Sequence, residues 1–549
     1  MIDYTLRVAI SKIKKSIKNF LITKNIKTNT KIEIKTKKNN ELWDLSTAFF
    51  LSFRDFAYTY GYDFCEALDI NGISAAVHKQ GFINFTLDHK IFFNDLRTII
   101  SSKEKYGIVS LEGQTISLDH TDTNPTGPAH AGHAKLAIAG DVISNFLEWC
   151  EADIKREFLV NDVGGQINIF QKSLDARVAE YKKQEFSLNN DYYLGKYVQD
   201  LAIKYAELSS EERLNAAMQE NIVEVLTLLK ERMDIKFDNI WYEKKLQSEV
   251  PQALKELEQY CYYYTPEKPI DYHNNDWKAI KVLTIDANEH KCILQKENGD
   301  HTYIAADIVF HKRRAEYASW LINIFGADHQ LHGEKLIGLM PKIKNVRLST
   351  VLCAMVRIIK DGKIIRMSKR SGQFLELKEL LDHCDADILK FEILSRNLAS
   401  PVIIDTDKIT YFSIENAFYY VQYCYARTCS VQNIAEKQEL WDQWEYIDFF
   451  KLTSSLEINL LKTLAQWSII TQHIIEDISS IHRITEYSRL LATHFHEWWH
   501  DGTHHTLNRI FTQDYEVTKA RLSLVYATQT ILRIIFKILG IKPISELGK

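Results

Sequence analysis

The sequence predicts an α/β fold built around a parallel sheet, with a smaller α+β module before it and a helical region after it. Strand and helix patterns alternate from about residue 106 to 405, as in a parallel sheet covered by helices. Within that region, residues 115–150 place a glycine-containing loop between a strand and a long helix. Glycine and proline make up about 5% of the 549 residues, against a usual ~12%, which favours a helix-rich chain. At about 150 residues per domain, the length predicts three or four domains.

Residues 1–105 are predicted to form the α+β module. Its first helix carries lysines around one apolar face, which consists of Leu6, Ile10, Ile13, Ile17 and Leu21. A membrane-surface or transit helix also fits this pattern, but the lysines interrupt any secretory apolar core and arginine is scarce, so the first helix of a folded domain is favoured. The lysine-rich run 24–38 fits phosphate contacts or a solvated face equally well. The further elements expected are a strand at Lys31–Lys35, a helix at Leu45–Tyr60 and a strand at Gly81–Asp88.

The most informative segment is the loop NPTGPAHAGH, residues 124–133, which follows a predicted strand at Thr115–His120 and opens a long helix. Gly127 allows the backbone to bend around a ligand, and His130 and His133 lie on one face of the first helical turn. The unpaired N–H groups and the positive dipole at such a helix start bind phosphate. By themselves, two histidines three apart also fit a surface pair or half of a metal site. No nearby cysteine or second histidine pair completes a zinc set.

The rest of the central region is predicted from apolar segments and turn residues. Residues 185–265 are charged and helical with little strand character, which predicts an insertion between the two halves of the sheet. The other expected features are a strand at Lys155–Asn161, a hairpin turn at Asn298 and Gly299, a strand at Trp320–Phe325, a strand at Val351–Ile359 that turns back at Asp361 and Gly362, and a basic loop, RMSKRSG, at Arg366–Gly372.

Beyond about residue 408 the chain is helical and rich in aromatic residues. Helices are expected at Asn416–Arg427 and Ala520–Ala527. Phe418, Val421 and Tyr425 recur at helical spacing and are predicted to pack in a core.

Composition limits the possible classes of protein. The net charge of -4 and the pI near 6.6 give no overall basic footprint, so any nucleic-acid contact would use local patches. Eight cysteines without a CxxC pair or zinc-finger spacing predict free, mostly buried thiols in a reducing compartment. No apolar run approaches the ~18 residues of a membrane helix, so no membrane association is expected.

The loop 124–133 resembles the ATP-binding motif of class I aminoacyl-tRNA synthetases, in the form found in arginyl-tRNA synthetases. The loop at 366–372 resembles their mobile KMSK loop, with Arg366 in the position of the first lysine. Further similarity lies in GFINF, NDVGGQI and NAFYYVQYCYAR, so the resemblance covers nearly the whole chain. It implies a Rossmann-like class I catalytic domain at 106–407 with the helical insertion at about 185–265. It also implies an additional tRNA-contacting domain at 1–105 and an all-α anticodon-binding bundle at 408–549.

The activity that this resemblance implies is that of an arginyl-tRNA synthetase, which activates L-arginine with ATP and transfers it to the 2′-hydroxyl of the terminal adenosine of tRNA(Arg). The resemblance further implies Mg²⁺ with the ATP, no zinc, a monomer and a cytoplasmic location. One alternative is another class I synthetase, such as one for cysteine. The other is a non-catalytic tRNA-binding paralogue, against which the presence of His130, His133 and Lys369 argues.

Adenylate formation leaves the protein mainly to position the reactants and to place cations or N–H donors where negative charge develops. His130, His133 and Lys369 match the catalytic positions of the family. The positions that match its ATP-binding residues are Pro125, Gly127, His130, Gly132, His133, Gly326, Asp328, Met367, Ser368 and Lys369. The positions that match its arginine-binding residues are Asp119, Asn124, Tyr303, Asp307 and His329. The chain departs from the family where Asp119 replaces a glutamate, Arg366 replaces a lysine, and HQLH replaces HHGY after Asp328.

Overall fold

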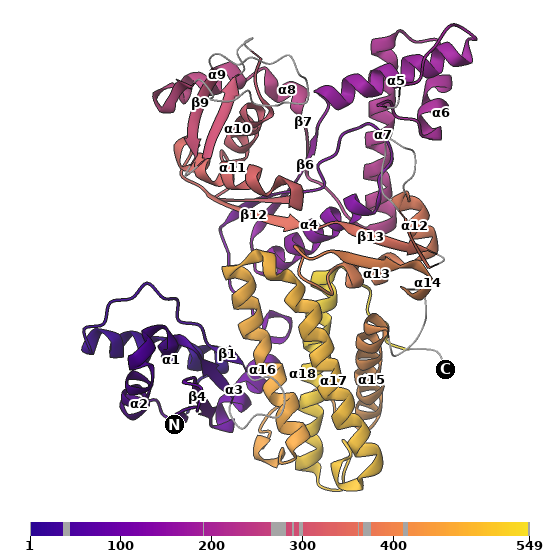
Figure 1. The fold of residues 1–549 in the computed structure, drawn as a ribbon. Helices are drawn as coiled ribbons and strands as arrows, with labels where there is room; N and C mark the ends of the chain where they lie inside the picture. Colours follow the sequence, from indigo (N-terminus) through magenta and orange to yellow (C-terminus); the bar gives the residue numbers. More distant parts are fainter. Residues whose placement is uncertain are drawn as a thin grey trace.

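The computed structural model describes residues 2–36, 44–189, 191–264, 282–287, 290–295, 300–360, 362–365, 375–409 and 416–546. Figure 1 shows a small module at the lower left, a sheet-containing part above and a bundle of long helices below it. This arrangement confirms the predicted α/β fold with an α+β module before it and a helical bundle after it. The predicted loop at 366–372 lies outside the described residues, and so do Asn298, Gly299 and Asp361.

The N-terminal module is a four-stranded antiparallel sheet packed with helices. The sheet order is β1 (Lys35–Thr36), β2 (Leu45–Thr47), β4 (Ile83–Leu87) and β3 (Ile73–Val77), and the helices are α1 (Leu6–Thr23), α2 (Ala57–Ala67) and α3 (His89–Ser102). The predicted apolar face of α1 is buried, which confirms a helix of a folded domain.

Two predicted elements of this module are wrong. The strand expected at Lys31–Lys35 begins only at Lys35, and the helix expected at Leu45–Tyr60 begins instead as strand β2, followed by a 3-10 helix over Phe49–Phe56. Leu45 pairs with Phe85 of β4, and Thr47 Oγ1 accepts the N–H of Phe49. Strand pairing and this side-chain bond therefore override the helical pattern.

The central sheet has five parallel strands in the order β12 (Arg347–Cys353), β11 (Trp320–Gly326), β5 (Thr115–Asp119), β6 (Asp153–Val160) and β7 (Asn239–Tyr242). Helix α4 (Ala131–Trp149) connects β5 to β6, as the junction at 115–150 predicted. Because all five strands run in one direction, their carboxyl ends meet at one edge, where ligands bind in sheets of this kind.

The segment predicted as a helical insertion is only partly helical. It contains α6 (Lys196–Lys204), α7 (Ser210–Met233), α8 (Glu243–Gln247) and α9 (Val250–Glu256), and it follows α5 (Gly165–Tyr181). The prediction is wrong for β7, which is the edge strand of the central sheet, and for β8 (Cys261–Tyr264). Four residues are too few to show a strand periodicity. The indole N–H of Trp241 on β7 donates to Glu157 on β6 at 2.8 Å, and this contact between residues 84 positions apart helps to hold β7 at the edge of the sheet.

Two smaller sheets complete this part. One is antiparallel, with β8, β9 (Val282–Ala287) and β10 (His290–Gln295), beside α10 (Tyr303–Arg314) and α11 (Gln330–Ile343). The other contains β14 (Lys363–Ile365), β13 (Val356–Lys360) and β15 (Val402–Asp405). Helices α12 (Leu377–His383) and α13 (Ala386–Ile393) lie between β14 and β15 in the chain, and α14 (Thr406–Ile409) follows β15.

The single strand predicted at Val351–Ile359 is wrong, because the chain changes sheets within it. Strand β12 ends at Cys353 beside β11, whereas β13 begins at Val356 beside β15. Between them, the N–H of Ala354 donates to Leu398 O at 2.8 Å, a partner that the local sequence cannot reveal. The predicted return is confirmed, since β13 and β14 form an antiparallel hairpin around Gly362.

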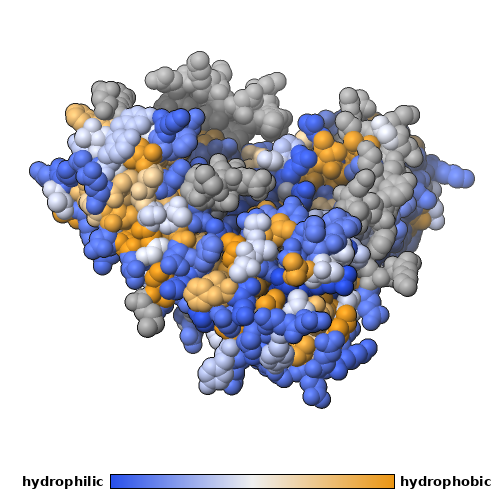
Figure 2. All heavy atoms as spheres, turned by 90° about the horizontal axis from the view of Figure 1, so that it is seen from below, coloured by the Kyte–Doolittle hydropathy of each residue, from blue (hydrophilic) through white to orange (hydrophobic). Residues whose placement is uncertain are grey.

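The helical bundle consists of α15 (Ala417–Lys437), α16 (Ser455–Glu476), α17 (Arg483–His504) and α18 (Tyr515–Leu539). Phe418, Val421 and Tyr425 are buried on α15, as predicted. Within the described chain, α18 is the one helix long and apolar enough to cross a membrane, and 89% of its apolar 18-residue window is buried inside the protein. Seen from below, the surface is mostly hydrophilic, with hydrophobic residues in scattered groups (Figure 2).

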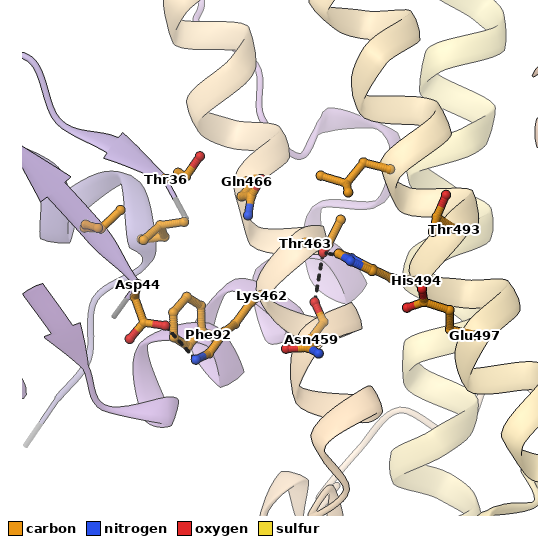
Figure 3. A pocket seen from close by; sticks show the side chains of 13 residues that line it. Thr36, Asp44, Phe92, Asn459, Lys462, Thr463, Gln466, Thr493, His494 and Glu497 are labelled. Carbon is orange, nitrogen blue, oxygen red and sulfur yellow. Dashed lines mark hydrogen bonds and ion pairs between the residues drawn. The ribbon is translucent and has the colours of Figure 1, made fainter. Parts of the chain in front are cut away.

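Polar contacts join the N-terminal module to the bundle (Figure 3). Lys462 Nζ on α16 lies 2.6 Å from Asp44 Oδ1, and the other oxygen of Asp44 accepts the N–H of Leu87 at 2.8 Å. A cavity of about 200 Å³ lies beside this ion pair, where Thr463 Oγ1 and His494 Nδ1 are 2.6 Å apart. These directional contacts orient the module against α16.

Candidate active site

A cavity of about 640 Å³ opens at the carboxyl edge of the central sheet, where β5, β6 and β11 end. Most of the predicted site residues that the structure describes line it, namely Asp119, Asn124, His130, His133, Tyr303, Asp307, Gly326 and His329. Pro125, Gly127 and Gly132 belong to the same loop and helix start without lining the cavity, and Asp328 does not line it either. Met367, Ser368 and Lys369 lie outside the described residues.

The two histidines at the start of α4 have defined hydrogen bonds. The His130 Nδ1 accepts the N–H of Gly132 at 3.1 Å, and the His133 Nδ1 accepts the N–H of His130 at 3.2 Å. The two rings stack with centroids 3.9 Å apart. Because each Nδ1 accepts a backbone N–H, the ring proton of each histidine is on Nε2. Both side chains therefore carry the ring proton on Nε2 at a helix N-terminus, and the Nε2 of His133 lies 3.4 Å from Thr123 Oγ1.

The loop before α4 is held from the side by the helices of residues 196–233. The hydroxyl of Tyr197 donates to Thr126 O at 2.9 Å, and the amide of Asn221 donates to Pro125 O at 3.0 Å. A Cβ on Gly127 would lie 2.7 Å from the Tyr197 ring. Close packing against α6 therefore requires a glycine at position 127, independently of any backbone freedom that ligand binding needs there.

The floor of the cavity carries two carboxyl groups from the end of β5 and the residues after it. Asp119 is only 2% exposed, and burial, followed by the neighbouring Asp122, raises its pKa well above the usual range. Burial also raises the pKa of Asp122 to about 6, although the side chain accepts the N–H of Leu159 at 3.3 Å. Sequence reasoning missed Asp122. Its position three residues after Asp119, in the same loop, was the available signal.

A second acidic wall comes from α10 and α8. Tyr303 and Asp307 lie one turn apart on α10, and the Asp307 Oδ2 lies 2.6 Å from the Nε2 of His332 on α11. Burial, followed by Asp307 and Asp162, raises the pKa of Glu243 to about 7. His332 and Glu243 both line the cavity and were also missed. His332 is the last residue of HQLH, where the departure from HHGY was the signal.

The carboxyl groups are supported from below by the buried guanidinium of Arg314. It donates to Ser117 Oγ at 2.8 Å, Ser117 O at 2.9 Å, Ile322 O at 3.0 Å and Asn323 Oδ1 at 2.6 Å. Its Nη1 lies 3.9 Å from the Asp119 Oδ2. This fork of donors joins β5 to β11 and places one positive charge beneath the acidic floor.

The residues at the end of β11 are more exposed. Gly326 lines the cavity, whereas the Asp328 side chain is 84% exposed and lies 3.7 Å from the Nε2 of His329. The structure thus brings His329 to the cavity rim but leaves Asp328 outside the lining.

No cluster of three or more histidine, cysteine or acidic side chains arranged to hold a metal occurs among the described residues. The eight cysteines are free and five of them are buried, as predicted.

Comparison with known proteins identifies the family. The family described as "tRNA synthetases class I (R), catalytic domain" matches residues 95–391, and the "DALR anticodon binding domain" matches residues 421–547. The chain is 30% identical over 506 residues to an arginine–tRNA ligase of Anaplasma marginale, which covers 87% of this chain and 86% of the relative. It is 31% identical over 485 residues to an arginine–tRNA ligase of Moorella thermoacetica, and this match covers 85% of this chain and 83% of the relative.

The fold is also that of a solved synthetase. The structure of Thermus thermophilus arginyl-tRNA synthetase superposes with a TM-score of 0.73 at 16% identity and covers 100% of both chains. Two kinds of observation point to the same family. They are the site itself, with its cavity at the sheet edge and its paired histidines at a helix start, and the family matches over most of the chain. The chain belongs to the arginyl-tRNA synthetase family of class I tRNA synthetases.

Proposed function

We propose that this chain joins L-arginine to tRNA(Arg) in two steps. Arginine first attacks the α-phosphorus of ATP through its carboxylate, which forms arginyl-adenylate and releases pyrophosphate. The 2′-hydroxyl of the terminal adenosine of the tRNA then takes the arginyl group from the adenylate, and AMP is released. The observation that carries this proposal is one cavity that combines an acidic wall, suited to the arginine cation, with two Nε2–H donors at a helix N-terminus, suited to phosphate.

His130 and His133 are proposed to donate their Nε2–H groups to phosphate oxygens as negative charge develops there. Their stacking and their backbone bonds hold both donors in place before the substrate arrives. Lys369 is proposed to bring a positive charge to the departing pyrophosphate. Gly326 and Asp328 are proposed to bind the adenosine ribose, and the remaining ATP contacts are Pro125, Gly127, Gly132, Met367 and Ser368.

The acidic wall is proposed to select arginine. Asp307 and Tyr303 would contact the guanidinium, and Asn124 would hold the α-amino group, with Asp119 and His329 beside them. A guanidinium presents five N–H donors in a plane, so carboxylates on its edges can recognise it in a geometry that an ammonium cannot match. Rejection of neutral side chains follows, because they would leave buried carboxylates without partners.

We further propose domain boundaries at 1–105, 106–407 and 408–549, a monomer, a cytoplasmic location and no membrane association. The family matches at 95–391 and 421–547 support the separation between a catalytic and an anticodon-binding domain. Mg²⁺ bound to ATP would offset phosphate charge, and no zinc is proposed.

The test is charging of total tRNA with each of the twenty amino acids by the purified chain. Arginine should be the only amino acid charged, and arginine-dependent ATP–pyrophosphate exchange should be weak without tRNA and strong with it. Robust exchange with another amino acid would assign a different class I synthetase. Binding of tRNA without any charging would instead indicate a non-catalytic paralogue.

A further inference from the structure

Two successive carbonyls of the buried loop before α4 receive their hydrogen bonds from side chains of distant helices. The Asn221 amide on α7 donates to Pro125 O at 3.0 Å, and the Tyr197 hydroxyl on α6 donates to Thr126 O at 2.9 Å. No backbone N–H of the described chain donates to either carbonyl. Because a buried carbonyl needs a donor, these two side chains determine which way this part of the loop faces.

Both bonds are shielded from water. Thr126 is 1% exposed and Asn221 is 3% exposed, so water cannot readily replace the side-chain donors. Burial raises the pKa of the Tyr197 hydroxyl, which therefore keeps its proton and remains a donor. A buried hydrogen bond of this kind is costly to leave unmade, so loss of a donor should displace the loop toward another partner.

The same loop is held from its other end by the segment that leads into α12. The N–H of Leu377 donates to Ala129 O at 2.8 Å, and Glu376 and His130 form an isolated antiparallel bridge. The carbonyls of residues 125, 126 and 129 are thus fixed by groups outside the central sheet. His130 follows directly, and it begins the helical turn that carries His133.

Helices α6 and α7 reach the loop as part of a separate packing unit. Figure 1 shows α5, α6 and α7 grouped at the upper right. These helices share a hydrophobic core of their own, to which Tyr197 adds its ring, whereas the second half of α7 packs into the main core. Neither Tyr197 nor Asn221 lines the cavity at the sheet edge.

We propose that Tyr197 and Asn221 are positioning residues for adenylate formation. They hold the loop so that the ring N–H groups of His130 and His133 lie where phosphate charge develops. This inference rests on the proposed function and adds two residues from outside the cavity to its machinery. Displacement of a catalytic group by about 1 Å can cost about 100-fold in rate. Since neither residue touches a substrate, the effect should fall on the rate of the chemical step and not on substrate binding.

Tyr197→Phe tests the proposal with the loss of one oxygen, because the phenyl ring still fills the space beside Gly127. In single-turnover assays with tRNA(Arg) present, the rate constant for adenylate formation should fall about 5- to 20-fold. Asn221→Ala should lower it about 10- to 100-fold, because its amide is the more deeply buried donor. The KM values for arginine and ATP should change less than about threefold in both variants.

Tyr205→Phe is the matched control. The Tyr205 hydroxyl, at the end of α6, donates to Glu220 Oε2 at 2.6 Å and not to the loop. This variant loses the same atom from the same group of helices, and its rate constant should stay within about twofold of the wild type. Thermal unfolding of all three variants separates a loss of stability from a loss of rate.

Wild-type adenylate formation by Tyr197→Phe would overturn the inference, as would an equal loss of rate in Tyr205→Phe. A raised KM with an unchanged rate constant would also overturn it, because it would assign the residues to substrate binding. If Asn221→Ala fails to fold, Tyr197→Phe decides alone. Failure of the wild-type protein to charge arginine would refute the proposed function and this inference with it, whereas the outcomes above refute the inference alone.

Discussion

Arg314→Lys tests whether the guanidinium beneath the cavity holds the two central strands together. Arg314 is completely buried and makes four hydrogen bonds, two to Ser117 on β5 and one each to Ile322 and Asn323 on β11. A lysine retains the charge but has three donors on one atom, which cannot reach acceptors on both sides of the fork. Each buried acceptor left without a donor costs about 1 to 3 kcal/mol, so the loss of donors to two acceptors should lower the free energy of unfolding by about 2 to 6 kcal/mol.

The adjacent Arg313 offers a matched control. Its side chain is 43% exposed, and it pairs with the half-exposed Glu249 and Glu316. Exposed ion pairs contribute little to stability and lysine keeps the charge, so Arg313→Lys should leave the urea unfolding midpoint close to that of the wild type. Urea unfolding followed by tryptophan fluorescence would compare the two variants, with hydrogen exchange of the β5 and β11 amides as the local measurement. Equal stability of the two variants would refute the assigned role of Arg314.

Three further predictions concern the reaction and the N-terminal module. Asp307→Ala should raise the KM for arginine by a factor of ten or more, because the buried arginine cation loses its partner. ATP binding to the free enzyme should change little. Near wild-type charging would show that Asp307 does not contact the arginine. Lys369→Ala should slow adenylate formation in single-turnover assays about a hundred- to a thousandfold and change the Kd for tRNA only a few-fold. Arg366→Ala and Arg370→Ala should be milder and more sensitive to salt, and normal adenylate formation by Lys369→Ala would contradict the mechanism. Finally, burial raises the pKa of Asp95 to about 7, so the folded state binds more protons than the unfolded state between pH 4 and 7 and loses stability as the pH rises through this window. Thermal unfolding of Asp95→Asn should show a weaker decline with pH than the wild type, and identical profiles would contradict the assignment.

Local sequence was sufficient wherever one element carries its own pattern. The strand at residues 115–119, the helix that follows it and the buried face of α15 could each be predicted, because periodicity and loop residues lie within one short segment. The same holds for His130 and His133, whose positions at a helix start follow from the loop itself. The predicted β5 and β11 then imply a common sheet edge, which is why most of the predicted site residues do line one cavity.

Distant pairing set the limits of prediction. Strand β7 is four residues long and Asn239–Tyr242 shows no strand pattern, so its place at the sheet edge depends on β6. The change of sheet between β12 and β13 likewise depends on neighbours more than 40 positions away, at Leu398 and Val402. A short segment contains no information about which distant backbone will satisfy its N–H and C=O groups.

By itself, the sequence determined the family, the order of the three structural parts and the residue types that chemistry of this kind needs. Only the tertiary structure decided how burial and neighbouring charges shift the pKa values of those residues. Without the family resemblance, Asp119 is an ordinary strand-end carboxylate in the sequence. Its raised pKa follows from burial and from the neighbouring Asp122, and it is opposed by Arg314, which comes from a helix almost 200 positions away. Ionisation depends on solvent exclusion and on charges within a few ångströms, and both are properties of the folded arrangement.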